Sequence, residues 1–368
     1  MNDSEQNIPP DSDDAIIEII KSEVPDFKIY EYVYEDGVHF LYGHLKNEPK
    51  DILKRLWVPL NNMGYDVQMS YELGENVLVV SPIVEQKERI WINVVLASIT
   101  FFTTMFVGSL FMFGGHPFSN PIDIIKGLPF TLAIMFVLGS HEMGHYFVAK
   151  IHGMKTSLPY FIPFPSIVGT MGAVIKNKGP IPSRKALFDV GVAGPVVGLI
   201  ASIVVTAIGL SLPPVILAVP ENGMFLNLSL PPLFLFIGSL LGGIGEDIII
   251  HPVAFAGWVG MLVTALNLIP AGQLDGGHVL WAILGPKADL VSRIMPFILL
   301  SIGFFVYDIM HQNGAMWIFW GLFIMLFATG GHPEPLDDAD EIGSSRKMLG
   351  ILVFAAGLLC VTLSPIQM

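Results

Sequence analysis

The chain has 368 residues, of which 52% are hydrophobic and only 14% charged, and its mean hydropathy is +0.63. Soluble globular proteins carry about 25% charged residues, so this composition excludes an ordinary soluble domain and favours a membrane protein. Much of the net charge of −13 comes from the first 89 residues, which hold 18 acidic and 8 basic side chains. An acidic N-terminal segment followed by an apolar chain argues against a nucleic-acid partner, because nucleic acids bind to basic protein surfaces.

The first 89 residues are interpreted as a tail followed by a small soluble domain. Residues 1–14 are polar and acidic, and we expect them to be disordered. Within residues 15–89, the pattern predicts a strand over 38–45, a helix over 49–63 and a hairpin over 66–80 that turns at 74–76. These elements would form an α+β accessory domain, with recruitment of a substrate as the alternative role.

Residues 90–368 are the expected membrane domain. Apolar runs predict about seven transmembrane helices, at 90–113, 127–151, 186–210, 252–283, 292–310, 315–329 and 348–364. The shorter, glycine-rich run 230–244 is interpreted as re-entrant or interfacial. The fold class expected is therefore an all-α polytopic membrane protein with a small α+β N-terminal domain.

The basic residues predict how this domain is oriented. With seven spans and a cytoplasmic N-terminus, nearly every Lys and Arg between the spans falls on the cytoplasmic side, as the positive-inside rule requires. The acidic N-terminus has the character of neither a cleavable signal nor an Arg-rich transit peptide. We therefore expect an integral protein of a prokaryotic plasma membrane.

The strongest chemical signal is the run His141-Glu142-Met143-Gly144-His145, near the end of the second expected span. Residues four apart share one helix face, so both imidazoles can reach a single Zn²⁺. Glu142 stands beside the first of them, where it can serve as the general base of a hydrolytic reaction. A charge at the bilayer centre costs at least about 2.5–3.5 kcal/mol, so ionisable groups in a span indicate function. The run predicts a catalytic metal site.

A third ligand is expected from the fourth span, because catalytic zinc usually has three protein ligands and a water. Asp275 and His141 each lie about ten residues before the cytoplasmic end of their spans, so Asp275 is the predicted ligand and His278 its rival. Pro270 and Gly272 would break the helix just before Asp275. Such a break is tolerated at membrane depth where the backbone is buried or lines a wet cavity.

Two further features of the spans have open interpretations. Asn267 is a candidate catalytic residue that donates a hydrogen bond to the reacting carbonyl, or else makes a helix–helix contact. The third span carries Gly191, Gly194 and Gly198, which predict close helix packing. The segment 156–178 alternates Pro with aromatic residues. It would offer a strand edge to an unwound substrate, or form an interfacial belt of aromatic side chains.

The paired motifs, His-Glu-x-x-His at 141–145 and Leu-Asp-Gly at 274–276, resemble those of the site-2 protease family of intramembrane zinc metalloproteases. Asn267, Pro270 and the run 192–195 are also similar to it. The long segment 154–185 and the run Gly-His-Pro-Glu-Pro at 331–335 resemble its archaeal, cyanobacterial and plastid branch. The resemblance implies a three-helix catalytic core, at about 127–285, in which His141, His145 and Asp275 hold one zinc ion.

The expected function is hydrolysis of peptide bonds in transmembrane or membrane-anchored protein substrates, with zinc as cofactor and the lipid bilayer as surroundings. One alternative is an ion or metal transporter, but transporters commonly show paired broken helices in internal repeats, and the sequence has one broken region. The other alternative is a non-catalytic binding protein of protease ancestry. Such a protein usually loses the glutamate or a ligand, and here all are present.

Overall fold

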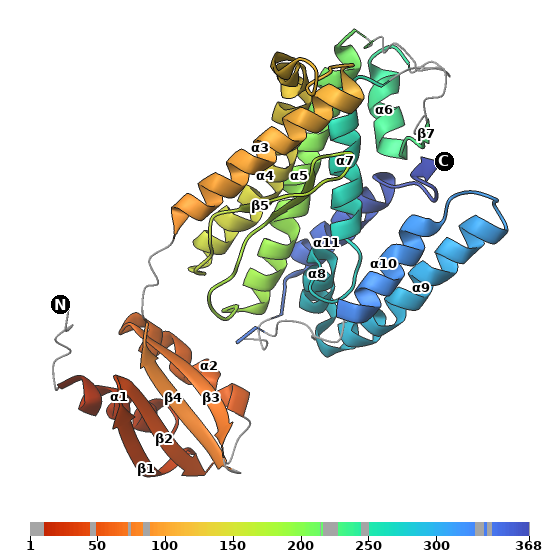
Figure 1. Cartoon of the computed structure of the whole chain (residues 1–368). Coiled ribbons are helices and arrows are strands. Elements are labelled where there is room, and N and C mark those ends of the chain that lie inside the picture. Colours follow the sequence, from red (N-terminus) through yellow and green to blue (C-terminus); the bar gives the residue numbers. More distant parts are fainter. Residues whose placement is uncertain are drawn as a thin grey trace. The chain divides into compact units, whose positions relative to one another are not determined.

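The computed structural model describes residues 11–44, 49–72, 75–83, 89–213, 215, 227–243, 250–327, 335–336 and 341–367, and divides the chain into two units (Figure 1). The first unit is Met1–Glu88 and the second Arg89–Met368. The described part of the second unit is mostly helical, whereas the first unit is built around a β-sheet.

The N-terminal unit packs two helices on a four-stranded antiparallel sheet. Its elements are α1 (Asp11–Glu23), β1 (Lys28–Glu35), β2 (Val38–His44), α2 (Pro49–Asn62), β3 (Tyr65–Glu72) and β4 (Glu75–Pro82). The strands follow the order β1-β2-β4-β3. Ile16 and Ile20 of α1 and Leu56 of α2 are fully buried together with Leu41 and Leu78 of the sheet. Alternate strand residues share a face, so one face of the sheet is covered by these helices.

The elements β2, α2 and the hairpin β3–β4 match the predicted strand, helix and hairpin. Glu75 and Asn76, which were predicted to be part of the turn, belong to β4, where they pair with Glu72 and Tyr71. Gly74 lies outside the described residues. The helix α1 begins at Asp11, so residues 11–14 are helical where a disordered tail was expected. The buried side chains of this helix, Ile16 and Ile20, come after these four residues and stabilise the helix that begins with them.

Four stretches of the membrane unit are long and apolar enough to cross a bilayer, counted over the described residues alone: Ile90–Met112, Pro121–Ile151, Arg184–Ser211 and Asp275–Asp308. They contain α3 (Ile90–Val107) with the π-turn η1 (Gly108–Met112), η2 (Pro121–Gly127) with α4 (Leu128–Ile151), α5 (Arg184–Ser211), and α8 (Asp275–Leu284) with η3 (Gly285–Lys287) and α9 (Ala288–Asp308). The helices α6 (Pro232–Leu240), α7 (Pro252–Asn267), α10 (Ala315–Phe327) and α11 (Ser344–Leu359) are shorter. The membrane character predicted from composition is thus supported, but helix length does not by itself give seven spans.

The predicted span 252–283 is two helices, α7 and α8, separated by an irregular stretch. The interruption falls at Pro270 and Gly272, as predicted, and Gly272 has a φ of +54°, a left-handed conformation that glycine adopts readily. The apolar run 230–244 contains the nine-residue helix α6, which at 1.5 Å per residue reaches about 14 Å and is too short to cross.

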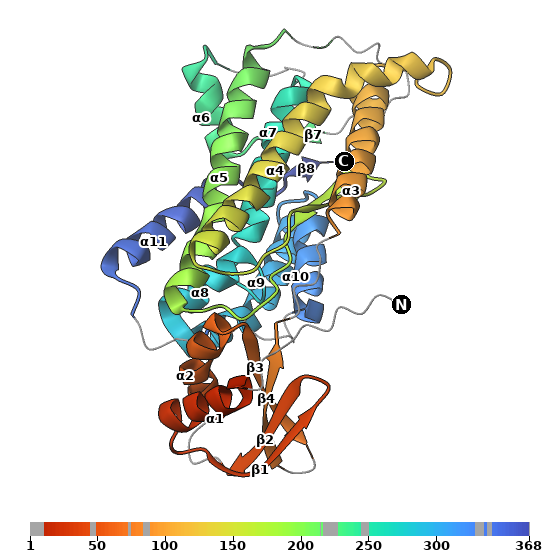
Figure 2. The same cartoon turned by 90° about the vertical axis from the view of Figure 1, so that its left-hand side faces the viewer.

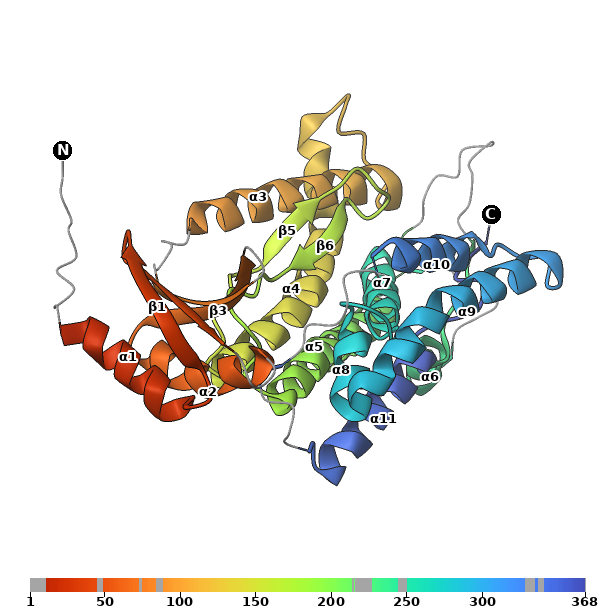
Figure 3. The same cartoon turned by 90° about the horizontal axis from the view of Figure 1, so that it is seen from below.

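The centre of the membrane unit is formed by α4, α5 and α7, which pack side by side (Figure 1). Their shared core includes Phe130 and Ile134 of α4, Val205 of α5 and Trp258 of α7. The helices α8 and α11 pack against the start of α5 (Figure 2). A two-stranded hairpin, β5 (Tyr160–Pro163) and β6 (Thr170–Val174), lies beside α3 and α4 (Figure 3). Strands β7 (Asn227–Leu228) and β8 (Ile366–Gln367) pair with each other.

Candidate metal centre

The helices α4 and α8, which both pack on α5, bring three potential metal ligands together. His141 and His145 lie one turn apart on α4, and Asp275 is the first residue of α8. Asp275 Oδ2 lies 3.3 Å from His141 Nε2 and 3.2 Å from His145 Nε2, and the two Nε2 atoms are 3.2 Å apart. Both imidazoles are buried, with 4% and 6% of their residues' surface exposed. The three atoms form a nearly equilateral triangle.

The size and chemistry of this triangle fit a zinc ion. In a tetrahedral zinc site with ligand bonds of about 2.0–2.2 Å, two ligand atoms lie about 3.3–3.6 Å apart. The triangle therefore has nearly the dimensions of one face of such a tetrahedron. Two imidazoles and one carboxylate are also a ligand set used by catalytic zinc sites, which keep the fourth position open. Among the residues that the structure describes, these three form the cluster able to hold a metal ion.

The helix α5 holds the two imidazoles in place. His145 Nδ1 donates a hydrogen bond of 2.8 Å to the backbone carbonyl of Val190, which leaves Nε2 as the lone-pair nitrogen facing the other ligands. A Cβ atom at Gly194 would overlap the His145 ring, and one at Gly198 would lie 2.7 Å from His141 Nδ1. The glycines predicted to allow close helix packing thus make room for the imidazoles.

Of the other predicted site residues, Glu142 and Asn267 lie close to the cluster and His278 does not. Glu142 is buried at 9% exposure, and the backbone of Ile175, the residue directly after β6, lies beside its carboxylate. Asn267, the last residue of α7, has its Nδ2 atom 3.2 Å from His141 Nε2. His278 lies about one turn beyond Asp275 and is not part of the three-residue cluster; its Cβ atom faces Gly191 of α5 instead.

The structure therefore gathers His141, Glu142, His145, Asn267 and Asp275, and it leaves His278 aside. Their roles as ligands and catalysts remain predictions. The contribution of α5 to the site was missed by the sequence reasoning. A signal for it exists in the spacing of Gly194 and Gly198, which are four residues apart like the two histidines that they face.

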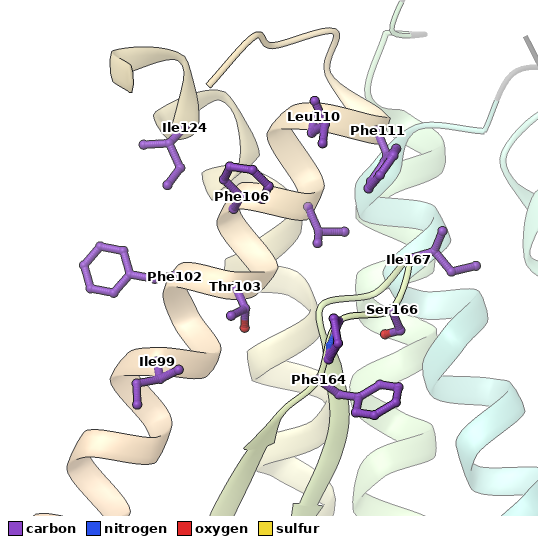
Figure 4. Close-up of a pocket in the computed structure, with 12 residues that line it drawn as sticks. Ile99, Phe102, Thr103, Phe106, Leu110, Phe111, Ile124, Phe164, Ser166 and Ile167 are labelled. Atoms are coloured by element: carbon purple, nitrogen blue, oxygen red, sulfur yellow. The ribbon is translucent and has the colours of Figure 1, made fainter. Parts of the chain in front are cut away.

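A separate apolar pocket of about 760 Å³ lies between α3 and the turn of the β5–β6 hairpin (Figure 4). Phe102, Phe106 and Phe111 line it from α3 and η1, and Phe164 and Ile167 line it from the hairpin turn. None of its lining residues belongs to the metal cluster. The chemistry of the site therefore has to be sought between α4 and α8.

Residues 129–308, which run from α4 to α9 and include every member of the gathered site, match the family model "Peptidase family M50". The match spans just under half of the chain, and this part of the chain is similar to that family. The sequence resemblance to site-2 proteases is confirmed at the level of the family. The run Gly-His-Pro-Glu-Pro at 331–335, which resembles one branch of site-2 proteases, lies outside the described residues except for Pro335.

Curated plant proteins are similar to longer parts of the chain. "Probable zinc metalloprotease EGY1, chloroplastic" of Arabidopsis thaliana is 31% identical over 65% of this chain and 43% of its own length. "Probable zinc metalloprotease EGY2, chloroplastic" of Oryza sativa subsp. indica is 26% identical over 94% of this chain and 65% of its own length. The chain thus covers less than half of the first relative and less than two thirds of the second. No solved structure matches the chain.

These relatives bear on the expected location. Their names place them in chloroplasts, so they do not support the prokaryotic plasma membrane expected from the sequence. The membrane itself is supported by the four long apolar helical stretches.

Proposed function

We propose that this chain is an intramembrane zinc metalloprotease that hydrolyses peptide bonds of membrane-anchored protein substrates. The observation that carries the proposal is the triangle of ligand atoms, 3.2–3.3 Å apart, from His141, His145 and Asp275. It lies in a family M50 segment with Glu142 next to it in sequence. The family and its relatives, which are named as zinc metalloproteases, favour this function over a transporter.

The residues around the cluster have the arrangement that amide hydrolysis requires. When bound, zinc supplies the Lewis acidity that acidifies a water and polarises a carbonyl. The carboxylate of Glu142, which lies beside the backbone of Ile175, takes the proton of the attacking water and then delivers it to the leaving amine. The Asn267 amide, close to His141, donates a hydrogen bond to the carbonyl oxygen as negative charge develops there.

The β5–β6 hairpin supports a substrate that is bound as a strand. A transmembrane helix hides its amides in its own hydrogen bonds, so it must unwind before it can be cut. In this two-stranded sheet, β6 pairs with β5 on one edge, and β6 leads directly to Ile175 beside Glu142. An unwound substrate segment added along the other edge of β6 would carry its backbone toward the catalytic carboxylate.

The proposal includes seven crossings, with α7 and α8 together forming one of them. Contacts between distant segments gather at two ends of the unit. At one end Arg184 Nε donates to the Ala282 carbonyl at 2.6 Å; at the other Trp317 Nε1 donates to the Leu363 carbonyl at 2.6 Å, and β7 pairs with β8. Helix α5 starts and helix α8 ends at the first end, whereas α10 starts and α11 ends near the second. Helices α5 and α11 therefore run in one direction and α8 and α10 in the other, as the proposed crossings require.

The orientation and the domain roles are part of the same proposal. The end that holds Arg184 is rich in Lys and Arg, so the positive-inside rule assigns it, with the N-terminus, to the cytoplasmic side. Residues 15–89 are then a soluble accessory domain, and about 127–285 the catalytic core of the membrane domain. A prokaryotic plasma membrane remains the prediction from the sequence.

The test compares the intact chain with Glu142→Gln in detergent, measuring zinc content and cleavage of a membrane-anchored test substrate. We expect one zinc per chain in both and cleavage by the intact chain alone, because Gln keeps the shape of Glu but cannot accept the proton. Zinc transport or an unchanged function in Glu142→Gln would favour the transporter or binding protein. Absence of zinc from the intact chain would refute the ligand assignment.

A further inference from the structure

An ion-pair cluster joins three helices close to the metal centre. The Asp189 carboxylate of α5 accepts two hydrogen bonds from Arg346 of α11, Nε to Oδ1 at 2.7 Å and Nη2 to Oδ2 at 2.8 Å. His152, which caps the end of α4, places its Nε2 atom 3.0 Å from Asp189 Oδ2. A two-point contact between a guanidinium and a carboxylate fixes orientation as well as distance. The cluster therefore sets how α11 lies on the start of α5.

Asp189 is the neighbour in sequence of Val190, the residue of α5 whose carbonyl orients the predicted ligand His145. Val190 follows Asp189, and its carbonyl accepts the 2.8 Å hydrogen bond from His145 Nδ1. Partners of this kind fix the ring orientation of a metal-binding histidine, and their loss costs about 10–100-fold in metal affinity. A shift of the start of α5 would therefore reach His145 through Val190.

On the other side of the contact, α11 supports α8. Gly350 of α11 lies against Ile283 and Val279 of α8, so close that a Cβ atom there would be 2.8 Å from Ile283 Cδ1. Further along α11, Gly357 packs in the same way against Leu268, the residue after Asn267. The helix α11 thus contacts both α8 and Leu268, at the start of the interruption that precedes α8.

The position of α8 depends on such lateral contacts. Gly272 before it and Gly285 after it have φ angles of +54° and +61°, so α8 is not a rigid continuation of α7 or of α9. Its last carbonyls, of Ala282 and Ile283, are held by Arg184 at 2.6 and 3.1 Å. Its first residue is the predicted ligand Asp275, so a displacement of α8 would move the carboxylate.

We propose that the Asp189–Arg346 ion pair is a positioning element of the metal centre, which locks α11 against α5 and α8 and so keeps Asp275 and His145 in ligating geometry. The helix α11 lies outside the residues 129–308 that match family M50, so the pair adds a support from beyond the matched core. The inference rests on the proposed metal site.

The test measures Zn²⁺ affinity, by competition with a chelator, in the full chain and in Arg346→Gln, Arg346→Lys and Asp189→Asn. The absorption spectrum of the Co²⁺-loaded proteins reports the ligand geometry. We expect about tenfold weaker Zn²⁺ binding and an altered Co²⁺ spectrum in Arg346→Gln and Asp189→Asn. Arg346→Lys should fall between them and the intact chain, because a lysine keeps the charge but loses the two-point contact.

The matched control is Lys347→Gln, which removes the same charge from the next residue of α11, where the side chain is exposed. It should bind Zn²⁺ like the intact chain. The charge exchange Asp189→Arg with Arg346→Asp should recover part of the affinity lost in the single variants. Zn²⁺ affinity and a Co²⁺ spectrum unchanged in Arg346→Gln, even with a lowered melting temperature, would overturn the positioning role and leave the proposed function intact. An intact chain that binds no Zn²⁺ would overturn both.

Discussion

The close fit of the two imidazoles against Gly194 and Gly198 of α5 can be tested by replacing either glycine with alanine, which adds a single methyl group. In Gly198→Ala, the new Cβ atom would lie 2.7 Å from His141 Nδ1 and 3.0 Å from its Cβ, against an optimal contact of about 3.5–4.0 Å. In Gly194→Ala, the overlap with the His145 ring is larger. The imidazole can turn away in the metal-free protein, but zinc binding must bring it back, so the cost is expected in zinc affinity.

The size of the effect follows from the cost of overpacking, about 1–3 kcal/mol for extra atoms in a well-packed interior. Since about 1.4 kcal/mol corresponds to a tenfold change in an equilibrium constant, Gly198→Ala should bind zinc roughly five- to a hundredfold more weakly. Gly194→Ala should bind it more weakly still. Alanine favours a helix over glycine by about 1 kcal/mol, so a weaker helix would not explain the loss.

The assay is competition with a chelator, together with the melting temperature of each metal-free protein. Gly179→Ala is the control, because a Cβ atom there would meet nothing within 4 Å. Equal zinc affinities of Gly194→Ala and Gly179→Ala would refute the idea that α5 confines the imidazoles.

Two further predictions concern the rival roles of residues near the cluster. Asp275→Asn should weaken zinc binding by more than about a hundredfold, which exceeds the usual loss when a residue that only orients a ligand is changed. His278→Gln should leave the zinc affinity within about threefold of the intact chain. The reverse order of the two affinities would make His278 the ligand. Asn267→Ala should retain zinc but lower kcat by about 10²–10³-fold if its amide donates to the reacting carbonyl. A kcat within about tenfold of the intact chain would instead assign Asn267 to helix–helix contact.

The local chemistry of the metal centre could be predicted because it is encoded in short stretches of chain. A four-residue spacing puts His141 and His145 on one helix face whatever surrounds them. A proline and a glycine interrupt a helix through their own backbone preferences, so the irregular stretch before Asp275 was also predictable. Charges inside apolar runs marked the same residues, because such charges are costly in a bilayer.

The remaining features depend on contacts between segments far apart in the chain. Asp275 was preferred to His278 from an estimate of depth, but only the packing of α8 on α5 turns His278 toward Gly191 and the Asp275 carboxylate toward the histidines. The run 252–283 was predicted as one span, although it is two helices.

Residue types and their near neighbours are enough to specify the apolar character of the chain, the histidine pair with Glu142, and the position of the helix interruption. The packing of separate helices, in contrast, places the imidazoles against Gly194 and Gly198 of α5. The same packing brings Arg346 to Asp189, which lies 157 positions earlier in the chain. Contacts of this kind arise when separate helices pack, and no periodicity within a single helix specifies which side chain another helix will meet.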